Sequence, residues 1–504
     1  MFSYSRFTHQ YDKSVFKYVE PISEDYRVFI NGEEIPVYTC RESKYPFNCW
    51  WRGHQRQIDQ TELSSFVNLV SDEELKVEVI PTKTYEKVMI KPYSKGISHN
   101  QTDGKICFVL KEHGSYVFQL DDYHNALYIF NSKPYYCENP EKVTYYFGAG
   151  IHMPGKISLK DNESVYIDKD ALVFGCIFAE NAKGIRIFGN GLIDDSGEER
   201  FCEHCYEAYT NGNLKFYDCR DLDVQGILLR NSAIWCVNLF HCFDVEISDI
   251  KIFGQWRYNT DGVDIVNSQN IVLKDSFVHS FDDSVTIKGI DRYIKTDCKN
   301  ITIEGCVLMC EWGRACEIGL ETSCREYSDI AFRDCDVLRG ASVVLDIQNG
   351  DCADVHDIVF EDIRAEFESF FTAAQIQRKE GDQYTKQDQY EGTALISISN
   401  PRFRSMYSFL DAMKDFTDIY DVDLTGVNVA AVRNILFKNI AVYYDEKIPQ
   451  KEGKLNLRIY VSSQDLPSSI YENIVIDNIT VNGKRITEDM LPIKTDRREA
   501  FEIK

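Results

Sequence analysis

Residues 244–247 read Asp-Val-Glu-Ile, an acid followed by alternating apolar and polar positions. The same phrase recurs along the chain as Asn or Asp, an aliphatic residue, any residue, and then an aliphatic residue or Phe. Alternation with a period of two is typical of a short β-strand. Asn and Asp suit a tight bend, because both tolerate the left-handed conformation. The phrase starts at Asp221, Asp244, Asn270, Asn300, Asp329, Asp357, Asn434 and Asn473.

The spacing of this phrase predicts how the strands assemble. The first six starts lie 23 to 30 residues apart, and no helical stripe fills the gaps. Strands too short to form a domain alone must stack on their neighbours to bury one face. A propeller blade needs four strands in about 40–45 residues, more than these gaps hold. We therefore predict an all-β chain in which residues 141–504 form a parallel β-helix. A β-sandwich with coincidental spacing is the alternative.

Two parts of the chain lack the repeat. Residues 1–140 predict a separate antiparallel, β-sandwich-like domain, which we also expect to cap the first rung of the β-helix. In it, residues 28–37 indicate a hairpin with Asn31-Gly32 at its turn, and residues 75–80, 88–91 and 106–110 alternate as strands. Residues from about 365 to 430 interrupt the repeat. Long excursions from a solenoid usually map to loops on one face, often the binding face.

The charge of the chain excludes several classes of partner. Acidic residues number 80 and basic residues 56, which gives a net charge of −24 and a pI of about 4.9. A chain this acidic is a poor ligand for nucleic acid or an anionic membrane, so we predict neither. The sequence has no stretch of about 18 uninterrupted apolar residues that would predict a transmembrane helix.

The cysteines and the start of the chain predict a cytoplasmic protein. The first residues lack a basic segment followed by an apolar run, so we expect no secretion signal. The 17 cysteines are odd in number and scattered, which favours small buried thiols over a disulfide framework. Cys202-Glu-His-Cys205 is the one Cys-x-x-Cys pair, and without a second pair we expect no metal there.

Three carboxylates predict acid–base chemistry. Asp261 lies in the stretch 259–264, and Asp282 and Asp283 lie in the stretch 280–284. Asp261 and Asp282 are 21 residues apart, slightly less than one repeat, so we expect them on adjacent rungs about 4.8 Å apart on an open face. Clustered carboxylates repel one another, and one tends to hold its proton near neutral pH. Such a group supplies the acid and the base that glycoside hydrolysis requires. Alternatively, these residues only bend and solvate the rungs.

A column of polar residues predicts a binding surface. Each member stands directly before a core aliphatic residue, one repeat apart: Asn238, Asp264, Thr286, Glu317 and Asp346. If the aliphatic residues point inward, the polar ones form an outward ladder. The ladder suits sugar hydroxyls, although an ordinary solvated face has the same pattern. Trp235, Trp256 and Trp312 fall in the same rungs, where Trp either contacts a sugar ring or packs in the core.

These motifs resemble those of the family 28 glycoside hydrolases, the polygalacturonase group. The resemblance lies in residues 259–265 and 281–289, with a similar preceding rung at 231–247, and covers roughly residues 145–365. It implies a right-handed parallel β-helix. It also implies that Asp282 is the general acid and that Asp261 and Asp283 activate the attacking water, with inversion of configuration. The preceding β domain resembles that of dextranase and isopullulanase enzymes.

Two departures from the family pattern bear on the substrate. Gly313-Arg314-Ala315 stands where the group has Gly-His-Gly, and Asp346-Ile347-Gln348 stands where it has the Arg-x-Lys that holds the substrate carboxylate. An acid at that point would repel galacturonate. We therefore expect the substrate to be a neutral oligosaccharide. The lesser alternative is an acidic sugar, because Lys288 and Arg314 are positively charged. The substrate-binding residues predicted are Asn259, Asp264, Lys288, Trp312, Arg314, Glu317, Asp346 and Gln348.

The sequence thus predicts an inverting glycosidase that needs no cofactor or metal, with a homo-oligomer left open. One rival is a β-helical polysaccharide lyase or uronate epimerase, with Ca²⁺ bound by the Asp-rich turns. The other rival is a non-catalytic carbohydrate-binding protein. His279 precedes Asp282 by three residues and either tunes the carboxylates or lies at the surface. Residues 50–62 are dense in aromatic and hydrogen-bonding groups and either reach the site or form a structural loop.

Overall fold

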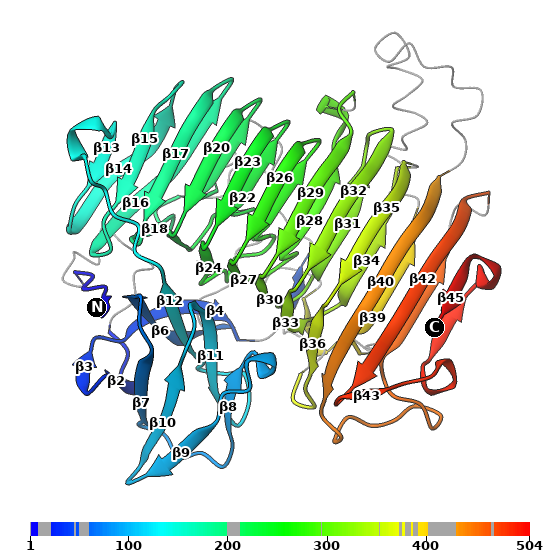
Figure 1. Cartoon of the computed structure of the whole chain (residues 1–504), viewed down its shortest axis with the longest axis horizontal. Coiled ribbons are helices and arrows are strands. Elements are labelled where there is room, and N and C mark those ends of the chain that lie inside the picture. Colours follow the sequence, from blue (N-terminus) through cyan, green and yellow to red (C-terminus); the bar gives the residue numbers. More distant parts are fainter. Residues whose placement is uncertain are drawn as a thin grey trace.

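The computed structural model describes residues 2–8, 22–44, 47–49, 60–198, 212–293, 295–351, 353–371, 375–377, 385–386, 392–401, 430–464 and 468–504. Within these ranges the chain forms strands and a few 3-10 turns but no α-helix, so the predicted all-β class is confirmed (Figure 1). None of the helical turns described is long or apolar enough to cross a membrane. Cys202–Cys205, residues 50–59 and most of the excursion at 365–430 lie outside the described residues.

The N-terminal strands form two packed sheets. One sheet has the order β1-β6-β12-β11-β8, with β4 paired to β6; the other has the order β3-β2-β7-β10-β9. The predicted hairpin is confirmed, because β2 and β3 pair antiparallel around Asn31 and Gly32. The strands are β1 (Phe2–Tyr4), β2 (Tyr26–Ile30), β3 (Glu33–Ile35), β4 (Tyr38–Ser43), β6 (Thr61–Ser71), β7 (Leu75–Pro81), β8 (Val88–Lys91), β9 (His99–Thr102), β10 (Lys105–Leu110), β11 (Gly114–Leu120) and β12 (Leu127–Ser132).

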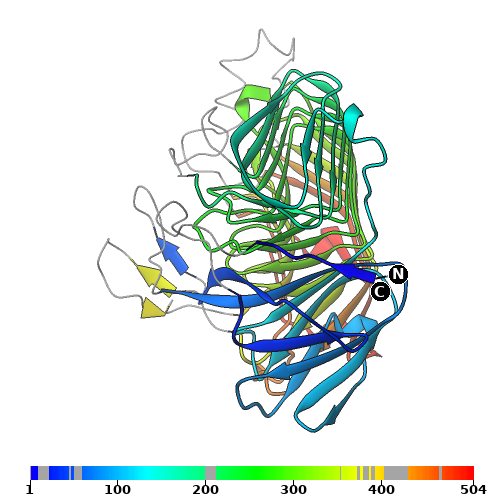
Figure 2. The same cartoon turned by 90° about the vertical axis from the view of Figure 1, so that its left-hand side faces the viewer.

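From β13 onward the chain winds into a right-handed parallel β-helix with three faces (Figures 1 and 2). The face that carries the polar column contains β16 (Ala171–Glu180), β19 (Leu214–Tyr217), β22 (Val237–Phe240), β25 (Val263–Val266), β28 (Val285–Gly289), β31 (Arg314–Thr322), β34 (Val343–Gln348), β39 (Ala394–Ser399), β41 (Arg458–Ser462) and β44 (Ile493–Thr495).

The second face contains β15 (Ser164–Ile167), β17 (Lys183–Gly189), β20 (Arg220–Gln225), β23 (Phe243–Ser248), β26 (Gln269–Lys274), β29 (Cys298–Glu304), β32 (Glu326–Arg333), β35 (Asp354–Glu361), β40 (Ala431–Tyr444), β42 (Ile470–Val481) and β45 (Phe501–Ile503). The third face contains β18 (Leu192–Asp194), β21 (Leu228–Arg230), β24 (Lys251–Phe253), β27 (Phe277–Ser280), β30 (Val307–Cys310), β33 (Asp336–Gly340) and β36 (Arg364–Phe367).

The remaining elements are short or lie at the ends. Strands β13 (Tyr145–Phe147) and β14 (Gly150–Leu159) begin the β-helix, and β43 (Lys484–Arg485) is a hairpin partner of β42. Strands β5 (Phe47–Cys49), β37 (Gln375–Gln377) and β38 (Thr385–Lys386) form a separate small sheet. The 3-10 turns are η2 (Tyr93–Lys95), η3 (Pro140–Lys142), η4 (Asp291–Tyr293), η5 (Glu488–Met490) and η6 (Arg498–Ala500).

The repeated phrase determines the bends of the β-helix as predicted. All eight of its Asn and Asp residues adopt a positive φ of 50° to 60°. Their side chains also hydrogen-bond from rung to rung, as Asn270 does to Asp244 (2.8 Å) and Asn300 does to Asn270 (2.9 Å). The apolar positions that follow each bend point into one continuous core. The cysteines contribute to such packing: of the 13 whose side chains the structure describes, all are free and 11 are buried.

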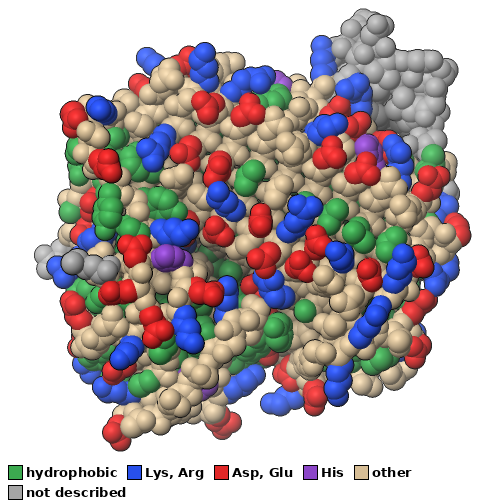
Figure 3. All heavy atoms as spheres, in the orientation of Figure 1, with side chains coloured by type: hydrophobic (Ala, Val, Ile, Leu, Met, Phe, Trp, Pro, Cys, Tyr) green, Lys and Arg blue, Asp and Glu red, His purple; other side chains and the backbone are tan. Residues whose placement is uncertain are grey.

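The second face of the β-helix is solvated. Opposite charges alternate along its rungs, as in the pairs Lys274–Glu246 (2.5 Å) and Lys438–Glu361 (2.7 Å). Figure 3 shows Lys, Arg, Asp and Glu side chains interspersed over the side of the molecule that carries these strands. No single sign of charge dominates this surface, which therefore offers no basic patch for a polyanion.

The third face is covered by the N-terminal domain. Phe66 and Phe130, from β6 and β12, contact Phe253 of β24 with ring centroids 4.8 and 5.1 Å apart. Phe130 also lies 5.3 Å from Phe277 of β27. A single buried cluster contains residues of both units, so the N-terminal domain is firmly packed on the strands that lead to the predicted catalytic turn.

Candidate active site

The residues of the predicted polar column are paired neighbours on successive strands of the first face. Pairing joins Asn238 to Asp264, Asp264 to Thr286, Thr286 to Glu317, and Glu317 to Asp346. The neighbouring aliphatic residues, such as Ile265 and Ile287, lie in the core, so the polar side chains project outward as predicted. The ladder is nevertheless buried, with Asp264, Glu317 and Asp346 at 0% exposure.

Asp261 lies one rung away from Asp282 and Asp283. The amide of Gly262 donates to the carbonyl of Asp283 over 2.8 Å, and the amide of Asp282 approaches the carbonyl of Thr260. On the other side, Gly313 contacts both carboxylates of the turn. A methyl group on Gly313 would lie 2.4 Å from Asp282 Oδ1 and 2.3 Å from Asp283 Oδ1. The three rungs therefore bring the predicted carboxylates together, and only glycine fits between them at position 313.

This site is more enclosed than the open face that we predicted. Asp261, Asp282 and Asp283 are only 1%, 6% and 6% exposed. Tyr258, Phe281 and Trp312 form an aromatic group directly beside the turn, with Tyr258 and Trp312 centroids 5.7 Å apart. Enclosure matters chemically because it removes water and strengthens every charge interaction in the site.

The two other tryptophans are core residues. Trp235 is 2% exposed and Trp256 is 1% exposed, so of the two alternatives these residues take the core position. Trp256 donates from Nε1 to Asn231 Oδ1 over 3.2 Å. Trp312 is half-buried and keeps an exposed part beside the carboxylates. Of the three, only Trp312 can offer a ring to a ligand.

Lys288 is the cation on the Asp261 side of the site. Its Nζ lies 2.9 Å from Asp261 Oδ2, 3.2 Å from Asp264 Oδ1 and 3.9 Å from Asp283 Oδ2. The same ammonium lies 3.9 Å from the centroid of the Trp235 ring. Asn259 adopts a positive φ of 59° and donates to Asp261 Oδ1 over 3.2 Å. Asn259 and Lys288 thus hold the two oxygens of Asp261 separately.

Arg314 is the cation on the Asp283 side. Its backbone amide donates to Asp283 Oδ1 over 2.9 Å, and its guanidinium lies 3.7 Å from that oxygen. The guanidinium also lies 3.8 Å from Glu317 and 3.4 Å from Asp346. Gln348 donates to Asp346 Oδ2 over 2.7 Å. Five acids therefore pair with two cations in this site, and Asp282, which pairs with neither, is the sixth acid beside them.

The environment separates the pKa values of the catalytic candidates. Burial raises the pKa of Asp282 well above its usual range, and the charges of Asp283 and Asp261 add to this. Burial also works to raise the pKa of Asp283, but the positive charges of Arg314 and Lys288 bring it below its usual value. Burial raises the pKa of Asp261 to about 7, with Lys288 opposing. Near neutral pH the site thus holds a protonated Asp282 beside an ionised Asp283.

The predicted binding residues divide into two groups. Asp264, Glu317 and Asp346 are completely buried counter-ions of Lys288 and Arg314, so they do not face sugar hydroxyls as we expected. Burial raises the pKa of Glu317 well above its usual range, and the neighbouring Asp283 charge raises it further. The residues that keep some exposure at the site are Asn259, Trp312, Arg314 and Gln348.

Sequence reasoning missed two residues. Gly313 was noted only as part of a motif, although its place one rung beyond the Asp282–Asp283 turn could have identified it as a contact. His279 was assigned either to the carboxylates or to the surface, but it is 4% exposed and bound on both sides by acids of distant segments. No local signal in the sequence identifies those partners.

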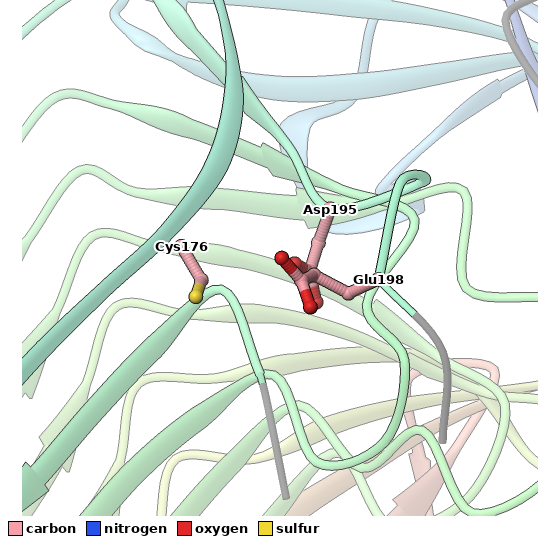
Figure 4. A group of neighbouring side chains, drawn as sticks. All are labelled: Cys176, Asp195 and Glu198. Carbon is pink, nitrogen blue, oxygen red and sulfur yellow. The ribbon is translucent and has the colours of Figure 1, made fainter. Parts of the chain in front are cut away.

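One group of potential metal ligands occurs in the described part of the chain (Figure 4). Cys176 lies in β16 of the first face, and Asp195 and Glu198 follow β18, three strands away from β27 on the third face. Cys176, Asp195 and Glu198 place a thiol and two carboxylates within 4.8 Å of one another. Burial raises the pKa of Asp195 well above its usual range, and the positive charge of Arg257 opposes this. Because a guanidinium already balances the acidic charge, we assign no metal to this group.

Comparisons with known proteins find similar sequences over the region that contains this site. The family model "Glycosyl hydrolases family 28" matches residues 144–367. An Aspergillus oryzae protein described as "Probable rhamnogalacturonase A" is 28% identical over 234 residues, which cover 44% of this chain and 46% of that protein. Rhamnogalacturonase B of Aspergillus niger is 29% identical over 162 residues, which cover 31% of this chain and 27% of that protein.

The matched region spans less than half the length of these curated relatives. Among solved structures, Dex49A from Penicillium minioluteum has a TM-score of 0.60 at 13% identity, covering 100% of this chain and 98% of that chain. This likeness extends the shared fold over the N-terminal domain as well as the β-helix. The region that matches glycosyl hydrolases family 28, residues 144–367, contains Asp261, Asp282 and Asp283, so this part of the chain is similar to that family.

Proposed function

We propose that the protein hydrolyses a glycosidic bond by an inverting, single-displacement mechanism. Asp282 donates its proton to the leaving oxygen, and Asp261 together with Asp283 accepts a proton from the attacking water. The observation that carries this proposal is that the surroundings shift the pKa values of two neighbouring carboxyls in opposite directions. Burial and two adjacent charges keep Asp282 protonated, whereas Arg314 and Lys288 keep Asp283 ionised. A protonated acid and an ionised base in one enclosed site are what the reaction needs.

The cations support a neutral sugar at the centre of the site. Lys288 is already neutralised by Asp261 and Asp264, and Arg314 is already shared by Asp283, Glu317 and Asp346. A uronate bound there would enter a site in which acids outnumber bases by six to two. Because an unpaired buried anion is costly, we propose that the sugar beside these residues carries no carboxylate. The residues offered to it are Asn259, Trp312, Arg314 and Gln348.

A product assay with matched variants tests the function. Wild type, Asp282→Asn and Asp329→Asn are incubated with neutral oligosaccharides, rhamnogalacturonan and polygalacturonan, with and without EDTA. Asp329 starts a repeat on the solvated face, and Asn tolerates its φ of 54°, so this variant is the control for loss of a carboxylate. We expect new reducing ends from wild type and Asp329→Asn, at least a hundredfold less from Asp282→Asn, and no effect of EDTA.

The product identifies the mechanism. The anomer released first, followed by NMR before it equilibrates, should have the inverted configuration. An unsaturated product whose formation requires Ca²⁺ would establish the lyase rival instead. Turnover of polygalacturonan alone would contradict the neutral sugar, and binding without turnover that is insensitive to Asp282→Asn would contradict the hydrolase.

A further inference from the structure

A chain of buried charged groups links the N-terminal domain to the catalytic rung. Glu42 of β4 lies 3.0 Å from His279 Nδ1, and His279 Nε2 lies 2.7 Å from Glu311 Oε1. The last of these contacts joins Arg339 of β33 to Glu311 Oε2 over 2.7 Å. Tyr128 of β12 donates to Glu42 Oε2 over 2.7 Å. The side chains of Glu42, His279, Glu311 and Arg339 are 2% to 7% exposed, so water screens these contacts little.

This chain of contacts ends at the two segments that hold the catalytic carboxylates. His279 lies in β27, and the Asp282–Asp283 turn follows directly after it. Glu311 begins the segment that contains Gly313, which contacts both carboxylates. The amide of Glu311 donates to the carbonyl of Ser280 (3.1 Å), and the amide of Trp312 donates to the carbonyl of Phe281 (2.8 Å). A shift of His279 relative to Glu311 would therefore change the spacing between the turn and Gly313.

We propose that Glu42 is a positioning residue for the reaction, although it belongs to the N-terminal domain and does not touch the reacting atoms. Through His279 it fixes the segment that carries Asp282 and Asp283, and through Glu311 the segment that packs against them. The N-terminal domain thus completes the active site of the β-helix. This inference rests on the proposed hydrolysis, in which a misplacement of about 1 Å is enough to cost about a hundredfold in rate.

The arrangement favours an imidazolium. A neutral imidazole has one N–H, whereas His279 faces a carboxylate at each ring nitrogen. Burial works to lower the pKa of His279, but Glu42 and Glu311 raise it to about 10. Other charged or titratable groups also face these contacts. The Tyr128 hydroxyl lies 2.7 Å from Glu42 Oε2 and 3.0 Å from His279 Nδ1, and Cys40 donates to Glu42 Oε1 over 3.9 Å. Arg339 pairs with Glu311, and the charges of Glu62 and His124 act on these acids from further away. Removing the charge of Glu42 therefore lets His279 lose its proton at lower pH.

A second interface contact offers a matched control. Glu368 also accepts a hydrogen bond from a tyrosine, Tyr93 (2.7 Å), and pairs with a buried cation, Lys91 (3.0 Å). Its side chain is 4% exposed, and it too joins the N-terminal domain to the β-helix. The difference is that Glu368 follows β36, and its side-chain partners within the described residues are Lys87, Lys91 and Tyr93 rather than the Asp282–Asp283 turn. Glu42→Gln and Glu368→Gln therefore remove comparable charges from the same interface.

The test measures steady-state kinetics from about pH 5 to 10 and thermal unfolding for both variants. Glu42→Gln should lower kcat at least about tenfold with KM within about twofold, and its alkaline limb should move to lower pH. Glu368→Gln should lower the melting temperature to a similar extent but keep kcat within about twofold of wild type. Equal losses of activity in both variants, or an unchanged kcat and pH profile in Glu42→Gln, would overturn the inference.

Hydrogen exchange separates this inference from the proposed function, because it needs no substrate. Amides of Phe281 to Ser284 should exchange faster in Glu42→Gln than in wild type and keep wild-type protection in Glu368→Gln. If wild type hydrolyses nothing, the proposed function fails, and the exchange result alone decides whether Glu42 holds the turn. Wild-type protection of these amides in Glu42→Gln would refute the positioning role whatever the activity.

Discussion

Substitution of Gly313 by alanine should disable the enzyme without unfolding it. The added Cβ would lie 2.3 Å from Asp283 Oδ1, 2.4 Å from Asp282 Oδ1 and 2.8 Å from the Asp283 amide nitrogen. Ordinary contact begins at 3.4 Å, so both carboxylates must move by about 1 Å. The φ of Gly313 is not in the left-handed region, so alanine adds no backbone strain there.

The size of the effect follows from these overlaps. Displacing both reacting groups by about 1 Å should lower kcat/KM about a hundredfold. Extra volume in a packed site should lower the free energy of unfolding by about 1–3 kcal/mol. Gly197→Ala is the control, because a Cβ at Gly197 meets nothing within 4 Å. Activity is measured on the substrate that the product assay identifies, and stability by urea unfolding.

Two results would refute this reasoning. If Gly313→Ala keeps kcat/KM within about twofold of wild type, the reacting groups are not the carboxylates that Gly313 contacts. If Gly313→Ala loses activity and its urea midpoint falls so far that the variant is unfolded under assay conditions, the loss of activity reflects unfolding and not displaced carboxylates. Gly197→Ala should match wild type in both assays.

Three further predictions concern pH and charge. The wild-type rate should fall as the pH drops below about 7, because burial raises the pKa of Asp261 to about 7 and this base must be ionised; a flat profile down to about pH 5 would contradict its role. Lys288→Met should lower the free energy of unfolding at pH 8 by about 3–5 kcal/mol, since it leaves Asp261 and Asp264 buried without a cation. The loss should be smaller at pH 5, where carboxyls take up protons, and urea unfolding that gives equal losses at both pH values would refute this. The pKa of His279 is raised to about 10 in the folded state, so its stabilisation is complete below about pH 6.5 and disappears as the pH rises toward 10. Between about pH 6.5 and 10, the free energy of unfolding measured in urea should therefore fall by up to about 5 kcal/mol more in wild type than in His279→Gln. If the free energy of unfolding depends on pH in the same way in both proteins, His279 does not retain its proton.

The bends, the strands and the register of the β-helix follow from local sequence. An Asn or Asp that accepts a positive φ, followed by alternating residues, specifies a turn and a strand within about five positions. Repetition at nearly constant spacing then aligns equivalent residues on successive rungs. For this reason the column from Asn238 to Asp346 and the adjacency of Asp261 to Asp282 could be predicted without a structure.

What covers each face, and hence which polar residues stay in water, was decided only by the tertiary structure. Asp264 belongs to the outward column, yet it lies in a buried ion pair with Lys288. Trp235 and Trp256 are buried as well. The N-terminal domain brings Glu42 to His279 across 237 residues of sequence, a contact that no periodicity encodes. A pKa depends on burial and on partners far along the chain. The raised pKa of Asp282 and the lowered pKa of Asp283, neighbours with the same side chain, therefore arise only in the folded protein.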